Sequence, residues 1–500
     1  MQSRPTKRRA PVPAGLLTVA TILIASSTLD AATWYVATDG SDASGDGSSG
    51  NPWATITHAV DNAAGGDEIV VRPGFYNGRQ RLRRQFDTPV HVRSEVPYAA
   101  KLRHDAGAAL ISFYGRNIVV EGFDIAHASG NTGGLVIQVQ DLRGDVAGSA
   151  GGTDPVVSGI EFRNNIIHSS TNNDLLKINN GAENIVVEGN LFFNQAGSDE
   201  HIDVNSVVGV TVQDNVFFNT SARPDTSSFV VVKDSNGSSD AVLGTRDVTI
   251  RRNVFLNWYG SGGQSFVRVG EDGTSNFEAV DVLVENNLML GNSPDLMRTP
   301  FTVQGARDVE FRNNTVVGDM PSRSFAARLF AGGSNPASED MRFFNNVWSD
   351  PTGTMGSEAY TGVDLFDSPP GDIASIVLDN NLYYNGGGTI PQDPTQSVTI
   401  ADDANARIGD PQLPDSAGVV VPVWNGTAFA DGSSSIRDVF VNLVEAHAVP
   451  APGSPIVDAA DPATSAADDI LGLARGLAPD LGAFETGSDT DLLFANSFET

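Results

Sequence analysis

A short pattern recurs through the middle of the chain: an alternating apolar strand, two polar or small residues, an asparagine and then an apolar pair. The asparagines of the clear copies are 25, 25, 38, 34, 27, 32 and 35 residues apart, at Asn165, Asn190, Asn215, Asn253, Asn287, Asn314, Asn346 and Asn381. An earlier copy carries Phe123 in this position. A period near 25 residues with strand alternation is typical of one coil of a parallel β-helix, in which longer intervals are coils with extended loops.

The repeated asparagine has a structural explanation. A tight bend between two strands leaves backbone donors and acceptors pointing inward, and a buried asparagine offers both a donor and an acceptor. Stacked asparagines can therefore satisfy the bends and each other, so we predict a structural ladder and exclude these residues from the catalytic candidates. A β-propeller would need four strands per blade, and the intervals are too short and uneven for that.

Composition excludes several classes of function. The chain has no cysteine, which rules out a disulfide scaffold, a thiol nucleophile and a zinc–thiolate site. Its formal net charge is −30, so we expect no nucleic-acid partner.

Residues 1–31 have the features of a secretory signal peptide. Arg4, Lys7, Arg8 and Arg9 precede an apolar run over 14–25, and small residues follow it. The run is short for a bilayer span, which disfavours the alternative of a membrane anchor. We expect a monomer that is secreted, or periplasmic, with no membrane span once the signal is removed.

Two end segments resemble those of secreted right-handed parallel β-helix proteins. Trp34–Ser41, Asn51–Val60 and Gly66–Tyr76 are similar to their opening, and Ser454–Asp458 with Pro479–Glu485 is similar to their closing pattern. The resemblance implies an all-β fold, a single-stranded right-handed parallel β-helix, with a short N-terminal capping helix near residues 55–64. We therefore expect a signal peptide over 1–31, a capped β-helix over 32–390, irregular C-terminal coils and a cap packed on the helix over 391–487, and a tail over 488–500.

A charged row is predicted on one face of the coils. When the strands around Lys177, Asp203, Lys233 and Arg268 are aligned by their apolar neighbours, Lys177, Asp203 and Arg268 share one outward position. Lys233 points outward two residues further along its strand. Three cations on one patch of so acidic a chain suggest a binding or catalytic site. The alternative is an ordinary solvated face.

The spacing of four acids predicts that they lie in the same region. Asp174 and Asp199 are 25 residues apart, one coil period, and Glu200 and Asp203 follow Asp199 closely. Carboxylates that meet at one point could hold Ca²⁺, which takes six to eight oxygen ligands. The alternative is that each acid caps a loop or faces solvent separately.

This arrangement resembles the calcium-dependent pectate lyases of polysaccharide lyase family 9. Those enzymes carry an aspartate on one coil, a Ser-Asp-Asp-Gly-x-Asp run on the next and a catalytic lysine on a following coil. Asp174 matches the first aspartate, 198–203 matches the run, and Lys233 matches the lysine.

The match has departures. Glu200 replaces the second aspartate of the run, His201 replaces its glycine, and the glycine-rich surroundings of the family's lysine are absent. Lys177 is the rival base, by similarity to the alginate and chondroitin lyase type of β-helix, although the Arg-His-Gly signature of that type is missing.

The resemblance implies β-elimination at a uronic acid of an acidic, pectate-like polysaccharide. Calcium would neutralise the sugar carboxylate, and a lysine would remove the neighbouring proton. The lysine pKa, ordinarily about 10.4, must fall for this role, and we expect Arg268 and the ion to lower it. The competing hypothesis is a non-catalytic β-helix that binds carbohydrate at a surface.

Overall fold

The structure, a computed structural model, describes residues 31–140, 156–197, 200–223, 225–237, 242–261, 265–291, 293–319, 324–353 and 364–487. The predicted signal segment, apart from residue 31, and the predicted tail lie outside these ranges. None of the helices within the described ranges is long and apolar enough to cross a membrane.

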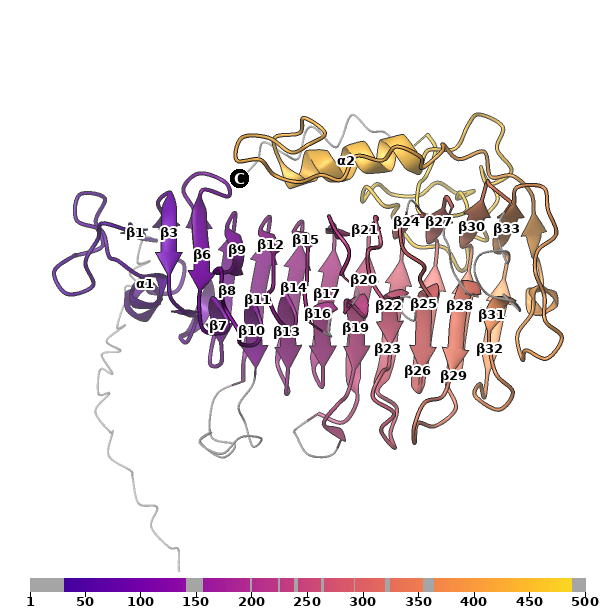
Figure 1. Ribbon diagram of the computed structural model, residues 1–500, viewed down its shortest axis with the longest axis horizontal. Helices are drawn as coiled ribbons and strands as arrows, with labels where there is room; N and C mark the ends of the chain where they lie inside the picture. The colour runs from indigo at the N-terminus through magenta and orange to yellow at the C-terminus, as the bar shows by residue number, and fades with distance from the viewer. Residues whose placement is uncertain are drawn as a thin grey trace, which may run out of the picture.

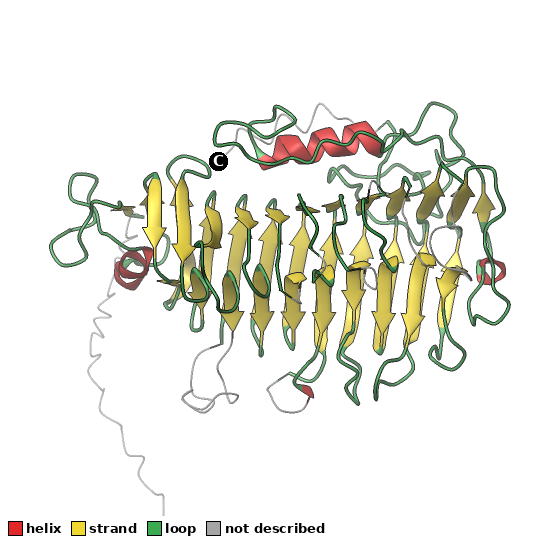
Figure 2. Ribbon diagram, viewed as in Figure 1, coloured by secondary structure: helices red, strands yellow, loops and turns green. Residues whose placement is uncertain are grey.

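Three long parallel sheets form the body of the molecule (Figures 1 and 2). Sheet 1 contains β1 (Thr33–Val36), β2 (Glu68–Val71), β5 (Gln85–Ser94), β8 (Arg116–Glu121), β11 (Ser158–Arg163), β14 (Glu183–Glu188), β17 (Val208–Gln213), β20 (Thr245–Arg251), β23 (Ala279–Glu285), β26 (Ala306–Arg312), β29 (Glu339–Phe344) and β32 (Ile376–Asp379). Sheet 2 contains β4 (Gln80–Arg81), β7 (Leu110–Ser112), β10 (Ile137–Gln140), β13 (Leu176–Asn179), β16 (Glu200–Asn205), β19 (Ser228–Lys233), β22 (Ser265–Val269), β25 (Thr299–Gln304), β28 (Ser324–Phe330) and β31 (Asp364–Asp367). Sheet 3 contains β3 (Gly74–Asn77), β6 (Ala100–His104), β9 (Asp124–His127), β12 (Ile166–His168), β15 (Leu191–Phe193), β18 (Val216–Phe218), β21 (Val254–Phe255), β24 (Leu288–Leu290), β27 (Thr315–Val317), β30 (Val347–Asp350), β33 (Leu382–Asn385) and β34 (Arg407–Ile408).

Through the repeated region, hydrogen-bonded neighbours within a sheet come from successive coils, as β13, β16 and β19 do in sheet 2. Each such coil gives one strand to each sheet, which confirms the predicted parallel β-helix. A single apolar core fills the space between the sheets along the stack.

The capping helix α1 (Ile56–Asn62) confirms the prediction for residues 55–64. Thr55 is its N-cap, and the Thr55 side chain accepts a hydrogen bond from the backbone N–H of His58. The helix buries Ile56, Ala59 and Val60 against the first coil, so the open end of the core is covered.

The asparagine ladder is confirmed. Asn215 donates its backbone N–H and its Nδ2 to Oδ1 of Asn253, at 3.1 and 3.0 Å, and its Nδ2 also reaches the carbonyl of Val187. The same pattern runs from Asn165 to Asn381, and there the carboxylate of Asp403 accepts the last bonds.

The residue before each ladder asparagine has a left-handed backbone, for example with φ 52° at Asn164, 67° at Gly189 and 58° at Asp214. Asparagine, aspartate and glycine adopt this conformation more readily than most residues. The polar or small residues of the sequence pattern are therefore explained by the bend geometry.

We expect Asn253→Ala to lower the stability of the fold by about 2–5 kcal/mol, because several buried ladder groups lose their partners together. Asn253 Nδ2 donates to Val212, Arg251 and Asn287, and its Oδ1 accepts from Asn215. The midpoint of thermal unfolding by circular dichroism measures the loss. The exposed control Asn62→Ala, whose Nδ2 reaches only the carbonyl of His58, should shift the midpoint little; equal shifts would contradict a structural ladder.

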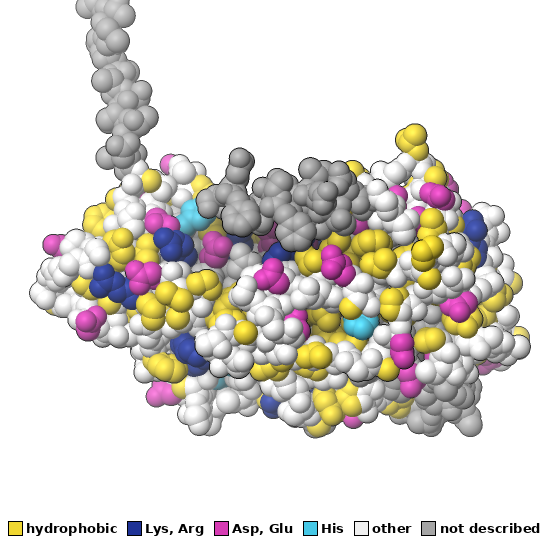
Figure 3. Space-filling view, turned by 90° about the horizontal axis from the view of Figure 1, so that it is seen from above, with side chains coloured by type: hydrophobic (Ala, Val, Ile, Leu, Met, Phe, Trp, Pro, Cys, Tyr) yellow, Lys and Arg dark blue, Asp and Glu magenta, His cyan; other side chains and the backbone are white. Residues whose placement is uncertain are grey.

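The C-terminal part of the chain lies over sheet 3 (Figure 1). A short 3₁₀ turn, η2 (Ile400–Asp402), leads from the last coil, and α2 (Ile436–His447) begins with a capping box between Ser435 and Asp438. The buried face of α2 packs with the outer side chains of sheet 3 in a second apolar cluster that includes Leu191, Phe218, Val439, Phe440 and Val444. On the surface seen from this side, Lys and Arg lie scattered among acidic and apolar side chains (Figure 3).

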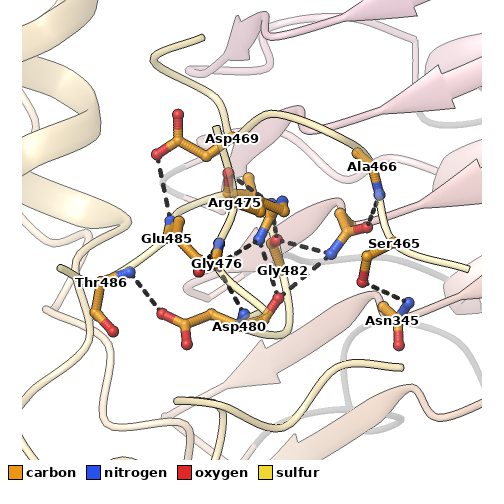
Figure 4. A network of polar contacts seen from close by, with 12 residues as sticks. Asn345, Ser465, Ala466, Asp469, Arg475, Gly476, Asp480, Gly482, Glu485 and Thr486 are labelled. Carbon is orange, nitrogen blue, oxygen red and sulfur yellow. Dashed lines mark hydrogen bonds and ion pairs between the residues drawn. The ribbon is translucent and has the colours of Figure 1, made fainter. Parts of the chain in front are cut away.

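Polar contacts attach this layer to the coils (Figure 4). Arg475 is buried; it pairs with Glu485 at 3.2 Å and donates to Oδ1 of Asn286 at 2.9 Å. Asn345 Nδ2 donates to Oγ of Ser465 at 3.1 Å. The residues that precede the ladder asparagines thus also hold the C-terminal layer in place.

Candidate functional site

The predicted register of the charged row is observed in sheet 2. Lys177 lies opposite Asp203, Asp203 opposite Val231, and Val231 opposite Arg268. Lys233 lies opposite Asn205, two residues further along the strand. One face of sheet 2 therefore carries these four charged side chains. Together with Asp174 and Glu200, which are described next, we call them the charged cluster.

A local bend brings the acids onto the same face. In β16, His201 and Ile202 both belong to the interior side; the His201 ring stacks on Phe229 with centroids 4.3 Å apart. If side chains alternated strictly along β16, Glu200 and Asp203 would lie on opposite faces of the sheet. The bend instead places both on the face that carries Asp174. Ligand oxygens of Asp174, Glu200 and Asp203 all lie within 4.8 Å of one another.

The carboxylate beside Asp174 in the next coil is Glu200. Oδ1 of Asp174 accepts the backbone N–H of Glu200 at 3.0 Å, because the register pairs residues 26 apart at this point. The expectation had placed Asp199 there from a 25-residue period. Asp199, the fourth expected ligand, lies outside the described residues.

Two lysines lie beside these acids, and Arg268 is connected to them through Glu271. Lys177 Nζ lies 2.5 Å from Oδ2 of Asp203 and 3.8 Å from Oδ2 of Asp174. Lys233 Nζ lies 3.6 Å from Oδ2 of Asp203 and 2.5 Å from Oε2 of Glu271. The Arg268 guanidinium lies 2.7 Å from Oε1 of the same Glu271.

The three acids suit a hard cation. Asp174, Glu200 and Asp203 are almost fully buried, and within the described part of the chain Oε2 of Glu200 and Oδ1 of Asp203 have no hydrogen-bond partner. Burial, followed by the charges of Glu271 and Asp174, raises the pKa of Glu200 well above its usual value. A divalent ion would relieve this repulsion, and an all-oxygen ligand set is the one that Ca²⁺ prefers.

The lysines do not have lowered pKa values in this arrangement. Burial lowers the pKa of Lys177, but the carboxylates of Asp203 and Asp174 outweigh burial and raise it to about 12. Burial likewise lowers the pKa of Lys233, and Asp203, Glu200 and Glu271 raise it above its usual value. The lowering expected from Arg268 and the ion together therefore depends on the ion, because among the described residues alone the nearby acids raise the pKa of both lysines.

Two glutamates of the site were missed in the sequence. Glu271 joins Lys233 to Arg268, and Glu278 is buried beneath the loop that carries Glu271. The Glu278 carboxylate accepts the backbone N–H groups of residues 271–274 at 2.7, 2.9, 2.6 and 3.3 Å, and Nδ2 of Asn335 at 2.8 Å. Their position shortly after the strand that carries Arg268 was the indication available in the sequence. Only the folded loop brings these two glutamates to the site.

We expect Glu278→Gln to lower the free energy of unfolding by about 1.5–3 kcal/mol, since an amide NH₂ would face backbone donors where a carboxylate oxygen now accepts them. Urea unfolding measures this loss. The control is Glu339→Gln, because Glu339 is partly exposed and lies 3.8 Å from Arg307. A Glu278 variant as stable as the control would show that the loop does not depend on this carboxylate.

Comparison with known proteins supports the fold. No protein-family model matches the sequence, and no curated protein matches it. Among solved structures, the chain is similar to pectate lyase Pel9A, with a TM-score of 0.50 and 15% identity, covering 91% of this chain and 96% of that one. It is also similar to GH136 lacto-N-biosidase from Eubacterium ramulus, with a TM-score of 0.51 and 11% identity, covering 75% of this chain and 68% of that one. At these identities the likeness concerns the fold, and the predicted likeness to a pectate lyase is confirmed at that level.

Proposed function

We propose that this protein is a secreted polysaccharide lyase that cleaves a uronic-acid-containing, pectate-like polymer by calcium-assisted β-elimination. The observation that carries the proposal is the charged cluster: three buried acids and three cations on one face of a parallel β-helix. The predicted signal peptide over residues 1–31 supports export to where such polymers occur. The likeness in fold to a pectate lyase agrees with it.

The cations explain how so acidic a chain could bind an acidic polymer. With a net charge of −30, the protein as a whole repels a polyanion. Lys177, Lys233 and Arg268 offset the acids of the site, and a bound Ca²⁺ would add the positive charge with which a uronate carboxylate can be held.

Each residue has a role in the proposed reaction. Asp174, Glu200 and Asp203 would hold Ca²⁺, with Asp199 a further ligand by the family resemblance. The bound ion would supply positive charge next to the sugar carboxylate, which makes the neighbouring C5 proton more acidic. Lys233 would accept this proton in its neutral form, which requires the bound ion to offset the acids that raise its pKa, and Arg268 orients Lys233 through Glu271. The electron pair of the C5–H bond forms the C4–C5 double bond, and the glycosidic oxygen leaves from C4 with the electron pair of the C4–O bond and takes a proton from water.

The test is incubation with a panel of polymers, including polygalacturonate and alginate, while the ultraviolet absorbance of the unsaturated product is followed. We expect activity that a chelator removes and added Ca²⁺ restores. New reducing ends without the absorbance would indicate hydrolysis. Binding without cleavage would favour the non-catalytic carbohydrate-binding alternative.

A further inference from the structure

A second cationic group lies on the same face of sheet 2, further towards the C-terminus. The outward row that contains Asp203 and Arg268 continues through Thr302 to Arg328 and then Asp367. Neighbouring strands are about 4.8 Å apart, so Arg328 lies about 10 Å from Arg268 along the stack, and three coils beyond Lys233.

The charges of this group are not balanced. Arg298 and Arg328 share a single carboxylate: Oδ2 of Asp367 accepts Nε of Arg298 at 3.1 Å and Nε of Arg328 at 3.0 Å. Two guanidinium groups and one carboxylate leave one positive charge, in a protein whose net charge is strongly negative.

The guanidinium of Arg328 is held in place with its outer edge available. Its Cζ lies 3.7 Å from the centroid of the Phe330 ring, and Asp367 engages only its Nε. Neither of its two terminal nitrogens has a partner among the residues that the structure describes, and 27% of the side chain is exposed. Burial, and then the nearby charge of Arg298, lowers the pKa of Arg328, so an anion would relieve the crowding of cations here.

We propose that Arg328, supported by Arg298, is a binding subsite for a second carboxylate of the acidic polymer, separate from the reacting one. A guanidinium edge with two N–H donors matches a carboxylate geometrically, and stacking on Phe330 reduces the entropy lost on binding. The inference rests on the proposed function, because it assumes that the polymer runs along sheet 2 across successive coils. With the polymer bound in this way, the protein would favour polymers that carry a charged sugar at the position facing Arg328.

The experiment compares Arg328→Gln with the control Arg342→Gln in the full-length protein. Arg342 belongs to sheet 1, pairs with Glu310 at 3.0 Å, and its loss changes the net charge by the same amount. Affinity electrophoresis measures binding to polygalacturonate, alginate and carboxyl-reduced polygalacturonate, and cleavage kinetics measures kcat and KM. Circular dichroism establishes that each variant is folded.

We expect Arg328→Gln to raise the Kd and KM for the acidic polymer about tenfold with kcat little changed, the loss expected for one charge-assisted contact, while Arg342→Gln has no effect. Binding of the carboxyl-reduced polymer should be the same for both variants. If Arg328→Gln does not fold, Arg328→Lys is the second variant. It keeps the positive charge but loses the paired N–H donors of the guanidinium, so it should weaken binding several-fold.

Two outcomes overturn the inference in distinguishable ways. If the wild-type protein binds or cleaves an acidic polymer and the Arg328 variant that folds behaves as Arg342→Gln does, the subsite is wrong and the proposed function stands. If the wild-type protein neither binds nor cleaves any uronate polymer, the proposed function and the subsite fail together.

Discussion

Replacing Lys233 with alanine should reduce the rate of polymer cleavage by about 10²–10⁴-fold, the contribution typical of one positioned general base. Lys233 lies between Asp203 and Glu271, where it faces the acids that would hold the ion. The matched variant is Lys177→Ala, since Lys177 lies on the same face and contacts the same Asp203. We expect the smaller loss for Lys177→Ala, and initial rates of ultraviolet absorbance measure both.

The structure changes the expected cost of this substitution in stability. The sequence predicts that Lys233 points outward, and the loss of a solvated outward side chain normally costs little stability, but only 9% of the Lys233 side chain is exposed. Removing it still leaves a cation beside both of its ion-pair partners, because Glu271 keeps Arg268 and Asp203 keeps Lys177. We therefore expect a folded variant with a modestly lower unfolding midpoint.

The outcome assigns the base. If Lys177→Ala is inactive and Lys233→Ala is active, Lys177 is the base. This result would agree with the exposure of the Lys177 side chain, 22% against 9% for Lys233. If both variants cleave the polymer at the wild-type rate, neither lysine removes the proton and the proposed mechanism is wrong.

Replacing Glu200 with glutamine should abolish most of the stabilisation by calcium. A ligand at 100 times its Kd stabilises a folded protein by about 2.7 kcal/mol, and one of the three clustered carboxylates is lost in this variant. Without the ion the variant should be at least as stable as the wild type, because it removes a buried acid that faces Asp174, Asp203 and Glu271. Thermal unfolding with a chelator and with a calcium titration measures both effects.

The control for this prediction is Glu310→Gln, on sheet 1, where Glu310 pairs with Arg312 and Arg342. It should leave the calcium-dependent shift of the unfolding midpoint unchanged. A Glu200 variant that responds to calcium as strongly as the wild type would show that Glu200 is not a ligand of the ion. A wild type without any calcium response would show that the charged cluster is a structural ion-pair network.

Much of the fold could be predicted from the sequence because a solenoid repeats its local rules. The asparagine ladder, with Asn215 bonded to Asn253, follows from one bend that recurs in every coil. The alignment of Lys177 with Asp203 follows from apolar alternation, since a slip of one residue would turn the core side chains outward.

The arrangement of the site depends on contacts of individual side chains that the repeated sequence pattern does not indicate. Turning His201 inward departs from strict alternation, and it brings Glu200 beside Asp174 on the face that carries Asp203. Glu271 reaches Lys233 only because Glu278 folds the intervening loop around its carboxylate. The pKa values of Lys177 and Lys233 are raised by carboxylates from several coils at once, against the lowering effect of burial. Such effects fall off with distance in space and not along the chain, so only the packed coils could establish them.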